Sequence, residues 1–506
     1  MIAYSKSFIP LGFTASLIEI EGDKSHGLPG FNIVGMARKT VSEARERVKS
    51  AIHSSGFAFP TEKLTINLAP ADLAKDGSYL DLAIAVNILI LSGQLLQTDI
   101  ADSAFIGELS LSGDLRPVRG IINLVESAKE SGIKQLFLPV KNFAQGTLIR
   151  GIKLVPVKSL QELYLHLKDQ APIPLPKKPI VKNTKTDDNL PSFSQIYGQE
   201  FAKRALTIAV AGHHNILLSG PPGTGKTMLA KAALSLLPPL NTAEQISVTK
   251  LHSLAGLTSD IVSTRPFRTP HHTSSLVSLI GGGQSAKPGE ISLANCGVLF
   301  LDELPEYPRV VLESLRQPLE DRQISISRVD HKITYPADFM LIATMNPCPC
   351  GYLGDSSHPC TCSLYQIENY RKKLSGPLMD RIDIFVDVGR VSISKLLNQS
   401  SISHADSTVK NTIKDALVAQ DTRYNSHNIY NASLSTHQIS TKLTLENSAK
   451  KMLDSAASTL DLSARSFFKV IKVARTIADL EKSAIIKTTH IAEALSYRYK
   501  PAKNAL

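Results

Sequence analysis

The sequence predicts an α/β protein whose central domain is a phosphate-binding parallel sheet flanked by helices. Residues 220–227 match the pattern G-x-x-x-x-G-K-[ST], with an apolar strand expected at 215–219 and a helix at 228–236. About 75 residues further on, a second apolar strand at 297–301 ends in two carboxylates, and a third at 339–346 ends in an amide. Polar groups at the carboxyl ends of several strands are typical of an open parallel sheet that binds a ligand there.

Length and composition limit the class of protein. At 506 residues the chain is too long for one core, so two to four domains are expected. Its 43% apolar and 20% charged residues are ordinary for a soluble protein, no apolar run is long enough to span a bilayer, and the first residues lack a signal-peptide pattern. We therefore expect a cytoplasmic protein with no membrane partner. The net charge of +11 favours a polyanion such as nucleic acid as a partner, and a solvated basic surface explains it equally well.

Four segments are expected along the chain. Residues 1–168 form a first α/β domain, and 169–190, which are rich in proline, lysine and polar residues, form a linker. Residues 191–390 carry the phosphate loop, and 391–506 are expected to be mostly helical. Inside the first domain, strands are expected at 64–68 and 135–139 and helices at 80–91 and 123–131.

The phosphate loop predicts the nucleotide ligand. Its glycines let backbone N–H groups converge on phosphate oxygens, Lys226 reaches the β- and γ-phosphates, and the hydroxyl of Thr227 ligates Mg²⁺. Asp302 is expected to hold the same ion, so the expected cofactors are ATP and magnesium. The residues predicted to bind them are Gly220, Pro221, Pro222, Gly223, Thr224, Gly225, Lys226, Thr227 and Asp302.

Four further residues predict hydrolysis and not nucleotide binding alone. Glu303 is placed to activate the attacking water, and Asn346 to contact the γ-phosphate or that water. Arg381 and Arg465, the latter at the start of a helix expected to run to residue 480, are candidates for stabilising the charge that develops on the phosphoryl group. From spacing alone, a surface salt bridge is the stronger interpretation for either arginine.

A cysteine cluster in loop 348–362 predicts a metal site. Four of the five cysteines fall within these fifteen residues, and four thiolates suffice for a closed tetrahedral zinc site. The one-residue spacers are tighter than usual, so a ligand set that includes His358, an unmetallated loop and a redox pair stay open. A closed set leaves no position for substrate, so zinc would be structural. The predicted ligands are Cys348, Cys350, Cys360 and Cys362, and Cys296 is expected in the core.

The order of these motifs resembles that of the AAA+ ATPases, most closely the branch of magnesium chelatase subunits and MCM helicases. Met36–Arg38, Arg268–His272, Pro288–Ala294 and Asn346–Gly351 extend the resemblance to the YifB/ComM magnesium chelatase-like proteins over nearly the whole chain. It implies a Lon-protease-like N-terminal domain, an AAA+ P-loop core with a parallel sheet, and a helical C-terminal lid. It also implies a homo-hexameric, DNA-dependent ATPase, because ComM proteins are branch-migration helicases that act on recombination intermediates in natural transformation.

The resemblance further implies roles for particular residues. Arg381 corresponds to the finger that reaches the neighbouring subunit's site, and Arg465 to the second sensor. An insertion at 254–290 and a hairpin at 324–334 correspond to pore elements, and the hairpin also shows the alternation of a strand pair. Cations there would grip phosphates without reading bases, or they form a solvated face. The candidate DNA contacts are Arg265, Arg268, His271, His272, Lys287, Arg328, His331 and Lys332.

The first domain is expected to be inactive as a protease. Residues 75–81 resemble the stretch that bears the Lon nucleophile, which falls on Tyr79, and the Lon catalytic lysine falls on Ile122. Neither side chain can serve a serine–lysine dyad, and the neighbouring Ser78 would still lack the amine. A basic stretch at 38–49 fits a DNA contact, a ring contact or a solvated helix.

Two other functions remain open for such an ATPase. A chelatase subunit would drive metal insertion into a tetrapyrrole, but the Lon-like domain, the basic charge and the cysteine loop disfavour it. A protein-remodelling or proteolytic machine is disfavoured by the missing dyad and by the absence of an evident aromatic-hydrophobic-glycine pore loop.

Overall fold

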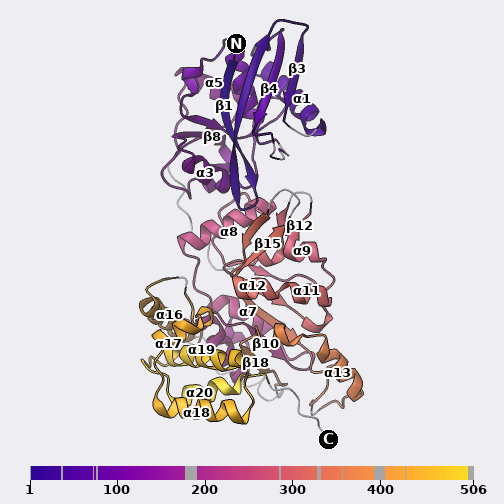
Figure 1. The fold of residues 1–506 in the computed structure, drawn as a ribbon, viewed down its shortest axis with the longest axis vertical. Coiled ribbons are helices and arrows are strands. Elements are labelled where there is room, and N and C mark those ends of the chain that lie inside the picture. The colour runs from indigo at the N-terminus through magenta and orange to yellow at the C-terminus, as the bar shows by residue number, and fades with distance from the viewer. Residues whose placement is uncertain are drawn as a thin grey trace.

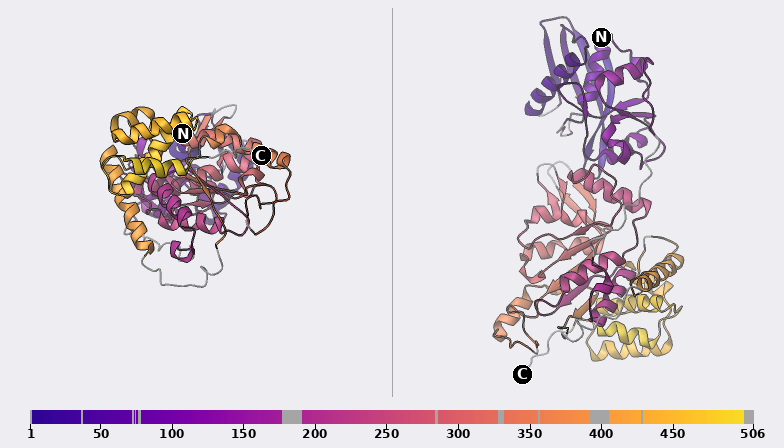
Figure 2. Two further views of the ribbon diagram at one scale, coloured as in Figure 1. Left: turned by 90° about the horizontal axis from the view of Figure 1, so that it is seen from below. Right: turned by 180° about the vertical axis from the view of Figure 1, so that it is seen from behind.

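The first domain is stacked on the central domain, and the C-terminal helices lie beside the central domain (Figure 1, Figure 2). Figure 1 shows the first domain at the top, the central domain below it, and the C-terminal helices against one side of the central domain, and Figure 2 agrees with this arrangement. The computed structural model describes residues 2–35, 38–71, 73, 75, 78–176, 191–283, 286–327, 332–355, 357–391, 405–427 and 429–499. No helix in this part of the chain is long and apolar enough to cross a membrane.

The first domain packs a four-stranded, a three-stranded and a two-stranded sheet around a buried helix. Its elements are β1 (Ile2–Leu11), β2 (Thr14–Ser25), β3 (Gly30–Val34), α1 (Arg38–Ser54), β4 (Lys63–Ala69), α2 (Asp81–Leu91), η1 (Gln97–Ile100), β5 (Ser103–Phe105), β6 (Glu108–Leu109), β7 (Leu115–Arg116), α3 (Ile121–Glu130), β8 (Gln135–Pro139), η2 (Val140–Asn142), α4 (Phe143–Gly146), β9 (Lys153–Val157) and α5 (Leu160–Leu167). The strand orders are β1-β2-β4-β3 and β5-β8-β9. The expected strands and helices correspond to β4, β8, α2 and α3, and their ends differ by at most two residues.

Helix α2 shows how this domain packs its core. Every residue of α2 is buried, because its apolar side chains face the sheet on one side and the rest of the domain on the other. The amide nitrogen of Asn87 donates to the carbonyl oxygens of Ala3 at 3.1 Å and of Ile20 at 3.0 Å, whereas its oxygen Oδ1 has no hydrogen-bond partner among the described residues.

The central domain contains the predicted parallel sheet. Its elements are η3 (Phe193–Gln195), α6 (Glu200–Gly212), β10 (Ile216–Ser219), α7 (Lys226–Leu236), α8 (Thr242–Ala255), β11 (Phe267–Arg268), α9 (Leu276–Ile280), β12 (Gly281–Gly282), β13 (Lys287–Pro288), α10 (Glu290–Leu293), β14 (Val298–Leu301), η4 (Leu304–Glu306), α11 (Arg309–Ser314), α12 (Arg316–Asp321), β15 (Gln323–Ser327), β16 (Lys332–Pro336), β17 (Met340–Met345), α13 (Leu364–Lys372), α14 (Gly376–Met379) and β18 (Ile384–Asp387). The order β11-β14-β17-β10-β18 is parallel throughout, so the carboxyl ends of β10, β14 and β17 meet at one edge.

Alternation along β10 decides which helices cover which face of the sheet. Ile216 and Leu218 join the core formed with α6, α7 and the C-terminal helices, whereas Leu217 joins the core formed with α11 and α14. The two-residue period of a strand thus builds one apolar layer on each side. This confirms the mixed α/β fold with a parallel P-loop sheet.

Two antiparallel hairpins project from the core toward the first domain. β12 pairs with β13, and β15 pairs with β16. They contact each other, because the hydroxyl of Tyr335 donates to the carbonyl oxygen of Ala286 at 2.6 Å, and a Cβ on Gly281 would lie 3.2 Å from Ile326. The hairpin expected at 324–334 is therefore present as β15 and β16, and its tip lies outside the described residues.

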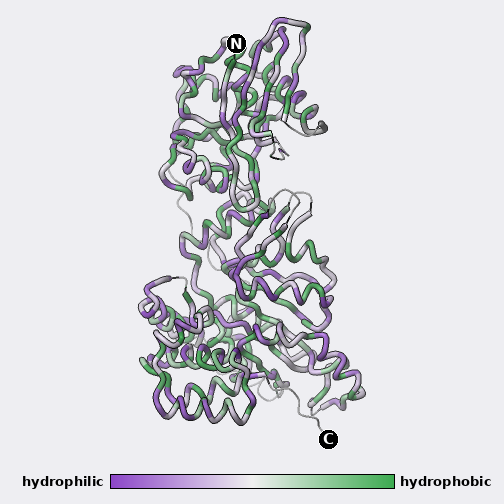
Figure 3. The backbone as a smooth tube through the Cα atoms, viewed as in Figure 1, coloured by the Kyte–Doolittle hydropathy of each residue, from purple (hydrophilic) through white to green (hydrophobic). Residues whose placement is uncertain are grey.

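The C-terminal region is helical, as expected. It comprises α16 (Ala405–Tyr424), η5 (Asn431–Ser433), α17 (Thr436–Lys442), α18 (Asn447–Thr459), α19 (Ala464–Leu480) and α20 (Thr488–Ser496). Hydrophilic and hydrophobic segments alternate along these helices in Figure 3, which is the pattern of helices with one buried face.

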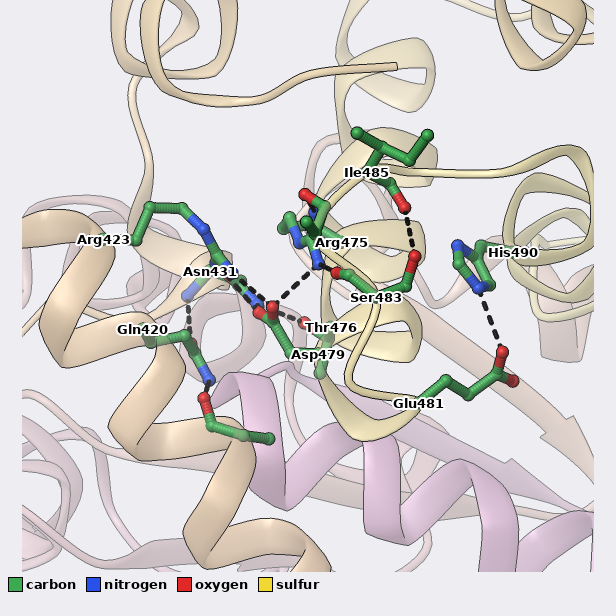
Figure 4. A network of polar contacts seen from close by, with 12 residues as sticks. Gln420, Arg423, Asn431, Arg475, Thr476, Asp479, Glu481, Ser483, Ile485 and His490 are labelled. Carbon is green, nitrogen blue, oxygen red and sulfur yellow. Dashed lines mark hydrogen bonds and ion pairs between the residues drawn. The ribbon is translucent and has the colours of Figure 1, made fainter. Parts of the chain in front are cut away.

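A buried polar network joins the C-terminal helices to each other and to the core. The carboxylate of Asp479 accepts hydrogen bonds from Arg475, Arg423 and the amide of Asn431, each at 2.9 Å (Figure 4). Thr476, one turn earlier on α19, bonds to the ring of His214 at 2.8 Å, next to β10. The C-terminal helices are thereby fixed to the chain just before the amino end of β10.

Candidate functional site

The phosphate loop has the backbone shape that anion binding requires. It connects the end of β10 to the start of α7, whose first residue is Lys226. Gly223 and Gly225 have φ of 76° and 82°, and a Cβ at either would meet nothing within 4 Å. Both therefore hold a left-handed conformation beside open space, where N–H groups can approach phosphate oxygens. The hydroxyl of Thr224 donates to the carbonyl oxygen of Pro221 at 2.9 Å and closes the loop.

Lys226 is held at the centre of the site. Its ammonium donates to the carbonyl oxygens of Gly220 at 2.7 Å and Pro221 at 2.9 Å, and to the side-chain oxygen of Asn346 at 3.3 Å. Burial lowers the pKa of Lys226, and the carboxylates of Asp302 and Glu303 oppose that shift. The fold thus brings the residue that ends β17 to the lysine of the loop, as the parallel order predicts.

The two carboxylates after β14 have different surroundings. Asp302 lies 3.4 Å from the hydroxyl of Thr227 and accepts a hydrogen bond from the hydroxyl of Thr344. Glu303 is exposed, has a φ of 52°, and its backbone N–H donates to Thr344 at 3.0 Å. A left-handed backbone at a residue other than glycine is uncommon and is often found at functional sites.

These residues fit a magnesium nucleotide. Thr227 and Asp302 offer a hydroxyl and a carboxylate, both exposed, which is the oxygen set that Mg²⁺ takes beside phosphate. The loop supplies backbone N–H groups at the start of α7, and Lys226 supplies a cation. When bound, the ion would neutralise charge on the phosphates.

Arg381 and Arg465 share one carboxylate. Both guanidinium groups contact Glu320 on α12, Arg465 at 3.1 Å, and Arg381 also donates to the carbonyl oxygens of Arg316 at 2.9 Å and Pro377 at 2.6 Å. In the described part of the chain, neither arginine bonds to residues 220–227. Burial raises the pKa of Glu320, but the two arginines outweigh it and leave that pKa below its usual value.

The four clustered cysteines meet in space. Their sulfur atoms all lie within 4.8 Å of one another, and hydrogen bonds to the backbone of Tyr352 and Thr361 lower the pKa of Cys350 to about 6. This set has the number and type of ligands that tetrahedral zinc requires. His358 stacks on the ring of Tyr352 at 5.1 Å and is exposed. Cys296 lies apart, and burial raises its pKa to about 12.

The cysteine loop also touches the phosphate loop. Gly351, between the two cysteine pairs, has a φ of 86°, and a Cβ there would lie 2.7 Å from Pro222. The cysteine loop therefore packs directly against the phosphate loop at Gly351 and Pro222.

The candidate DNA contacts divide into two groups. Arg265 is nearly buried and donates to Glu244 and to the carbonyl oxygens of Pro238 and Cys296, and Arg268 forms a two-pronged ion pair with Glu290 at 2.6 and 2.7 Å. Both guanidinium groups are therefore engaged inside the subunit. The second group comprises His271, Lys287 and Lys332, which are exposed, and His272, which is half-buried. Arg328 and His331 lie outside the described residues.

The former dyad positions of the first domain are filled by packing. Tyr79 and Ile122 belong to one apolar cluster. Ser78 hydrogen-bonds to the carboxylate of Glu108, and the amine of Lys75 donates to backbone carbonyls, including that of Leu73 at 3.3 Å. Among the described residues, no lysine amine forms a hydrogen bond with Ser78.

Three residues of the site escaped prediction. Thr344 could have been noticed in the sequence, because it is a polar residue inside an otherwise apolar strand. Gln199 donates to the carbonyl oxygen of Thr224 at 2.6 Å from the start of α6, and Glu320 holds the two arginines. Neither has a local sequence pattern, because each meets its partners only through the tertiary fold.

Three family models match the chain. The model described as "Magnesium chelatase, subunit ChlI" matches residues 192–396, "Subunit ChlI of Mg-chelatase" matches 20–142, and "Magnesium chelatase, subunit ChlI C-terminal" matches 403–498. Together the three matches touch the first domain, the nucleotide site and the C-terminal helices.

Curated relatives match over nearly the full length. Competence protein ComM of Haemophilus influenzae is 41% identical over 502 residues, which cover 98% of this chain and 97% of the relative. A protein of Escherichia coli named YifB is 41% identical over 490 residues, which cover 96% of this chain and 95% of the relative. An archaeal Lon protease of Methanocaldococcus jannaschii is 27% identical over 156 residues, 30% of this chain and 24% of the relative.

Proposed function

Because the chain belongs to the YifB/ComM family of magnesium chelatase-like AAA+ ATPases, we propose that it is an ATP-driven DNA motor that works as a homo-hexamer and migrates branches in recombination intermediates during natural transformation. Family membership supports ATP hydrolysis, with ATP and magnesium as cofactors. The ring, the DNA substrate and branch migration are the further steps of the proposal.

One observation supports the ring: within one chain, the two arginines proposed for hydrolysis bond to Glu320 and not to the phosphate loop. The phosphate loop, Asp302 and Glu303 lie at one edge of the sheet, whereas Arg381 and Arg465 meet at Glu320 without a bond to that loop. Phosphoryl transfer needs cationic groups on the developing charge. Both arginines therefore serve the site of a neighbouring subunit in our proposal, and a closed ring supplies every site.

The proposed division of labour follows from the geometry. Lys226 binds the phosphates, Thr227 and Asp302 hold the magnesium ion, and Thr344 keeps Asp302 oriented. Glu303 orients the attacking water and takes its proton, while Asn346 contacts the γ-phosphate or that water. Magnesium, when bound, supplies charge neutralisation on the transferred group.

The DNA surface is proposed on the two adjoining hairpins. Lys287 on β13 and Lys332 on β16 are both exposed, and β12–β13 contacts β15–β16 through Tyr335 and Ala286. His271 and His272 lie on the segment before α9. Cations on neighbouring hairpins would contact phosphates without regard to base sequence. Arg265 and Arg268 are left out of this surface because carboxylates already hold them.

We also propose structural zinc on Cys348, Cys350, Cys360 and Cys362, and a cytoplasmic location. The cluster has the donor set and proximity for zinc, and the described cysteines form no disulfide. A reducing compartment that contains DNA suits both features.

The test is the steady-state ATPase rate with and without forked DNA at fixed salt. The proposal expects stimulation by DNA that falls as salt rises, because phosphate contacts release counterions. Lys226→Ala, which retains the hairpins, should bind DNA without hydrolysing ATP. A wild-type ATPase that no DNA stimulates would contradict the proposal.

A chelatase-type function is the second candidate because all three matching family models carry the name of a magnesium chelatase subunit. It predicts that the ATPase responds to a chelatase partner loaded with tetrapyrrole and not to DNA. The same ATPase measurement with both additions separates the two functions.

A further inference from the structure

The first domain contacts the core along strand β16 of the proposed DNA hairpin. The turn between β1 and β2, at Gly12 and Phe13, enters an apolar cluster with Leu251 of α8 and with Ile333 and Tyr335 of β16. In Figure 1 the lower ends of β1 and β2 reach α8 and β15. Tyr335 is 2% exposed and Ile333 is 8% exposed, so this side of the hairpin is covered.

The Gly12–Phe13 turn packs closely against Ile333 and Tyr335 of the hairpin. A Cβ on Gly12 would lie 2.3 Å from the Cγ2 atom of Ile333, so only glycine allows the turn to approach so closely. The ring of Phe13 meets that of Tyr335 edge to face, with centroids 6.5 Å apart. The side chains of Ile333 and Tyr335 thus pack the hairpin against this turn.

A buried charge holds the same turn from the other side. The ammonium of Lys250 lies 4.2 Å from the centre of the Phe13 ring and 2.5 Å from the carboxylate of Glu126 on α3. The side chain of Lys250 is only 7% exposed, so both contacts act in a poorly solvated place. α8 of the core and α3 of the first domain are joined there by a cation that also faces Phe13.

Further hydrogen bonds fix α8 to the first domain. The hydroxyl of Ser253 donates to Gln145 at 3.0 Å and accepts from the backbone N–H of Gly120 at 3.0 Å, and Gln145 donates to the carbonyl oxygen of Asp260 at 2.9 Å. Ser253 and Gln145 are buried. The two domains thus meet in a packed interface in which the buried polar groups of Ser253 and Gln145 have hydrogen-bond partners.

The strand period separates the two sides of β16. Ile333 and Tyr335 face the first domain, whereas Lys332 and Thr334 between them are exposed. A shift of the Gly12–Phe13 turn would therefore move Ile333 and Tyr335, and with them Lys332 on the same strand. We infer that Phe13 and Lys250 are positioning residues, through which the first domain sets the place of the β15–β16 hairpin and couples it to the ATPase. The coupling to DNA rests on the proposed function, and the positioning of the hairpin does not.

The experiment compares full-length wild type with Phe13→Ala and Lys250→Met. Phe13→Tyr, which keeps the ring over Lys250, is the rescue variant, and Leu28→Ala, at an exposed position of the same domain, is the matched control. Amide hydrogen exchange of peptides covering 323–327 and 332–336 is followed first, without DNA or nucleotide. We expect exchange there to rise about tenfold in Phe13→Ala and Lys250→Met, and to stay at the wild-type rate in the other two variants.

The second readout is the ATPase rate against the concentration of forked DNA. Phe13→Ala should keep the rate measured without DNA and need about two- to tenfold more DNA for half-maximal stimulation. If amide hydrogen exchange in the hairpin is unchanged in both Phe13→Ala and Lys250→Met, the inference is wrong, whether or not DNA stimulates the ATPase. Faster exchange with wild-type DNA stimulation would overturn the coupling. If hairpin exchange is faster in the variants but DNA does not stimulate the wild-type ATPase, the positioning role is supported and the proposed DNA motor is contradicted.

Discussion

The hydroxyl of Thr344 donates a hydrogen bond to the carboxylate of Asp302 across the gap between β17 and β14. Thr344 is fully buried and also accepts the backbone N–H of Glu303 at 3.0 Å. One side chain thereby orients the carboxylate proposed to bind magnesium and the backbone of the residue proposed to activate water. Such a group determines the geometry of the site although it touches no substrate.

Thr344→Val should lower kcat by about tenfold, because Asp302 and the N–H of Glu303 both lose a partner. Val has nearly the shape of Thr, so thermal unfolding should change little. Thr344→Ser, which keeps the hydroxyl, should retain most of the activity, and Thr422→Val on the exposed side of α16 serves as control. Wild-type kcat in Thr344→Val would show that the site does not depend on this hydroxyl.

Glu303→Gln should bind ATP and fail to hydrolyse it, with kcat lower by at least about a hundredfold, because the amide cannot take the proton of the attacking water. Binding of a fluorescent nucleotide and single-turnover hydrolysis measure the two steps separately. If both steps weaken together, Glu303 would be a ligand and not the base.

Glu320→Gln should lower kcat by about two- to tenfold at an unchanged KM for ATP, because Arg381 and Arg465 lose the carboxylate that holds them at one place. The matched control is Glu313→Gln, since Glu313 pairs with Arg316 at 2.7 Å and also hydrogen-bonds to Ser375, and neither Arg381 nor Arg465 is among these partners.

The effect of Glu320→Gln should also pass to the neighbouring subunit. A chain with both Lys226→Ala and Glu320→Gln cannot hydrolyse ATP, but in mixed rings it should depress wild-type subunits more than Lys226→Ala alone does. Equal depression by the two chains would place the action of Glu320 within its own subunit.

The sequence predicted the parts of the site that have a local pattern. The phosphate loop, Asp302, Glu303 and Asn346 follow apolar strands, and the parallel order brings them to one edge, as expected. Pairings between distant residues could not be predicted. Arg265, a DNA contact predicted from the sequence, forms an ion pair with Glu244, which lies 21 positions earlier in the chain. Likewise, the β1–β2 hairpin carried no pattern that linked it to Ile333.

Removal of metal from the cysteine loop should act on the nucleotide site. We expect about one zinc per chain by elemental analysis. Cys360→Ser or treatment with a strong chelator should lower the unfolding temperature and raise the KM for ATP, because Gly351 packs against Pro222. Cys296→Ser, outside the cluster, should change neither the zinc content nor the KM. Zinc-free protein with full activity and an unchanged unfolding temperature would exclude this site.

Acid should weaken the attachment of the lid. Burial lowers the pKa of His213 to about 4, with Asp338 opposing, from an ordinary value of 6.5, and its ring stacks on Tyr430 beside the lid at 4.8 Å. The unfolded chain therefore binds more protons between these two values, and stability present above pH 6.5 is lost as the pH falls toward 4. The other charged groups that face His213 are Arg322, Arg265 and His214.

His213→Asn should remove about one proton from this pH dependence, because asparagine does not titrate here and tolerates the left-handed φ of 57°. Unfolding temperatures between pH 7 and 4.5 provide the measurement, with His26→Asn at an exposed position as control. An identical pH slope in His213→Asn and wild type would assign the acid sensitivity to other groups.

Branch migration of a mobile four-way DNA junction by purified protein tests the proposed motor itself. Wild type with ATP and magnesium should convert the junction to its two duplex products, and Lys226→Ala should bind the junction and leave it intact. Equal conversion by Lys226→Ala, or none by a wild-type protein that hydrolyses ATP, would contradict an ATP-driven motor on branched DNA.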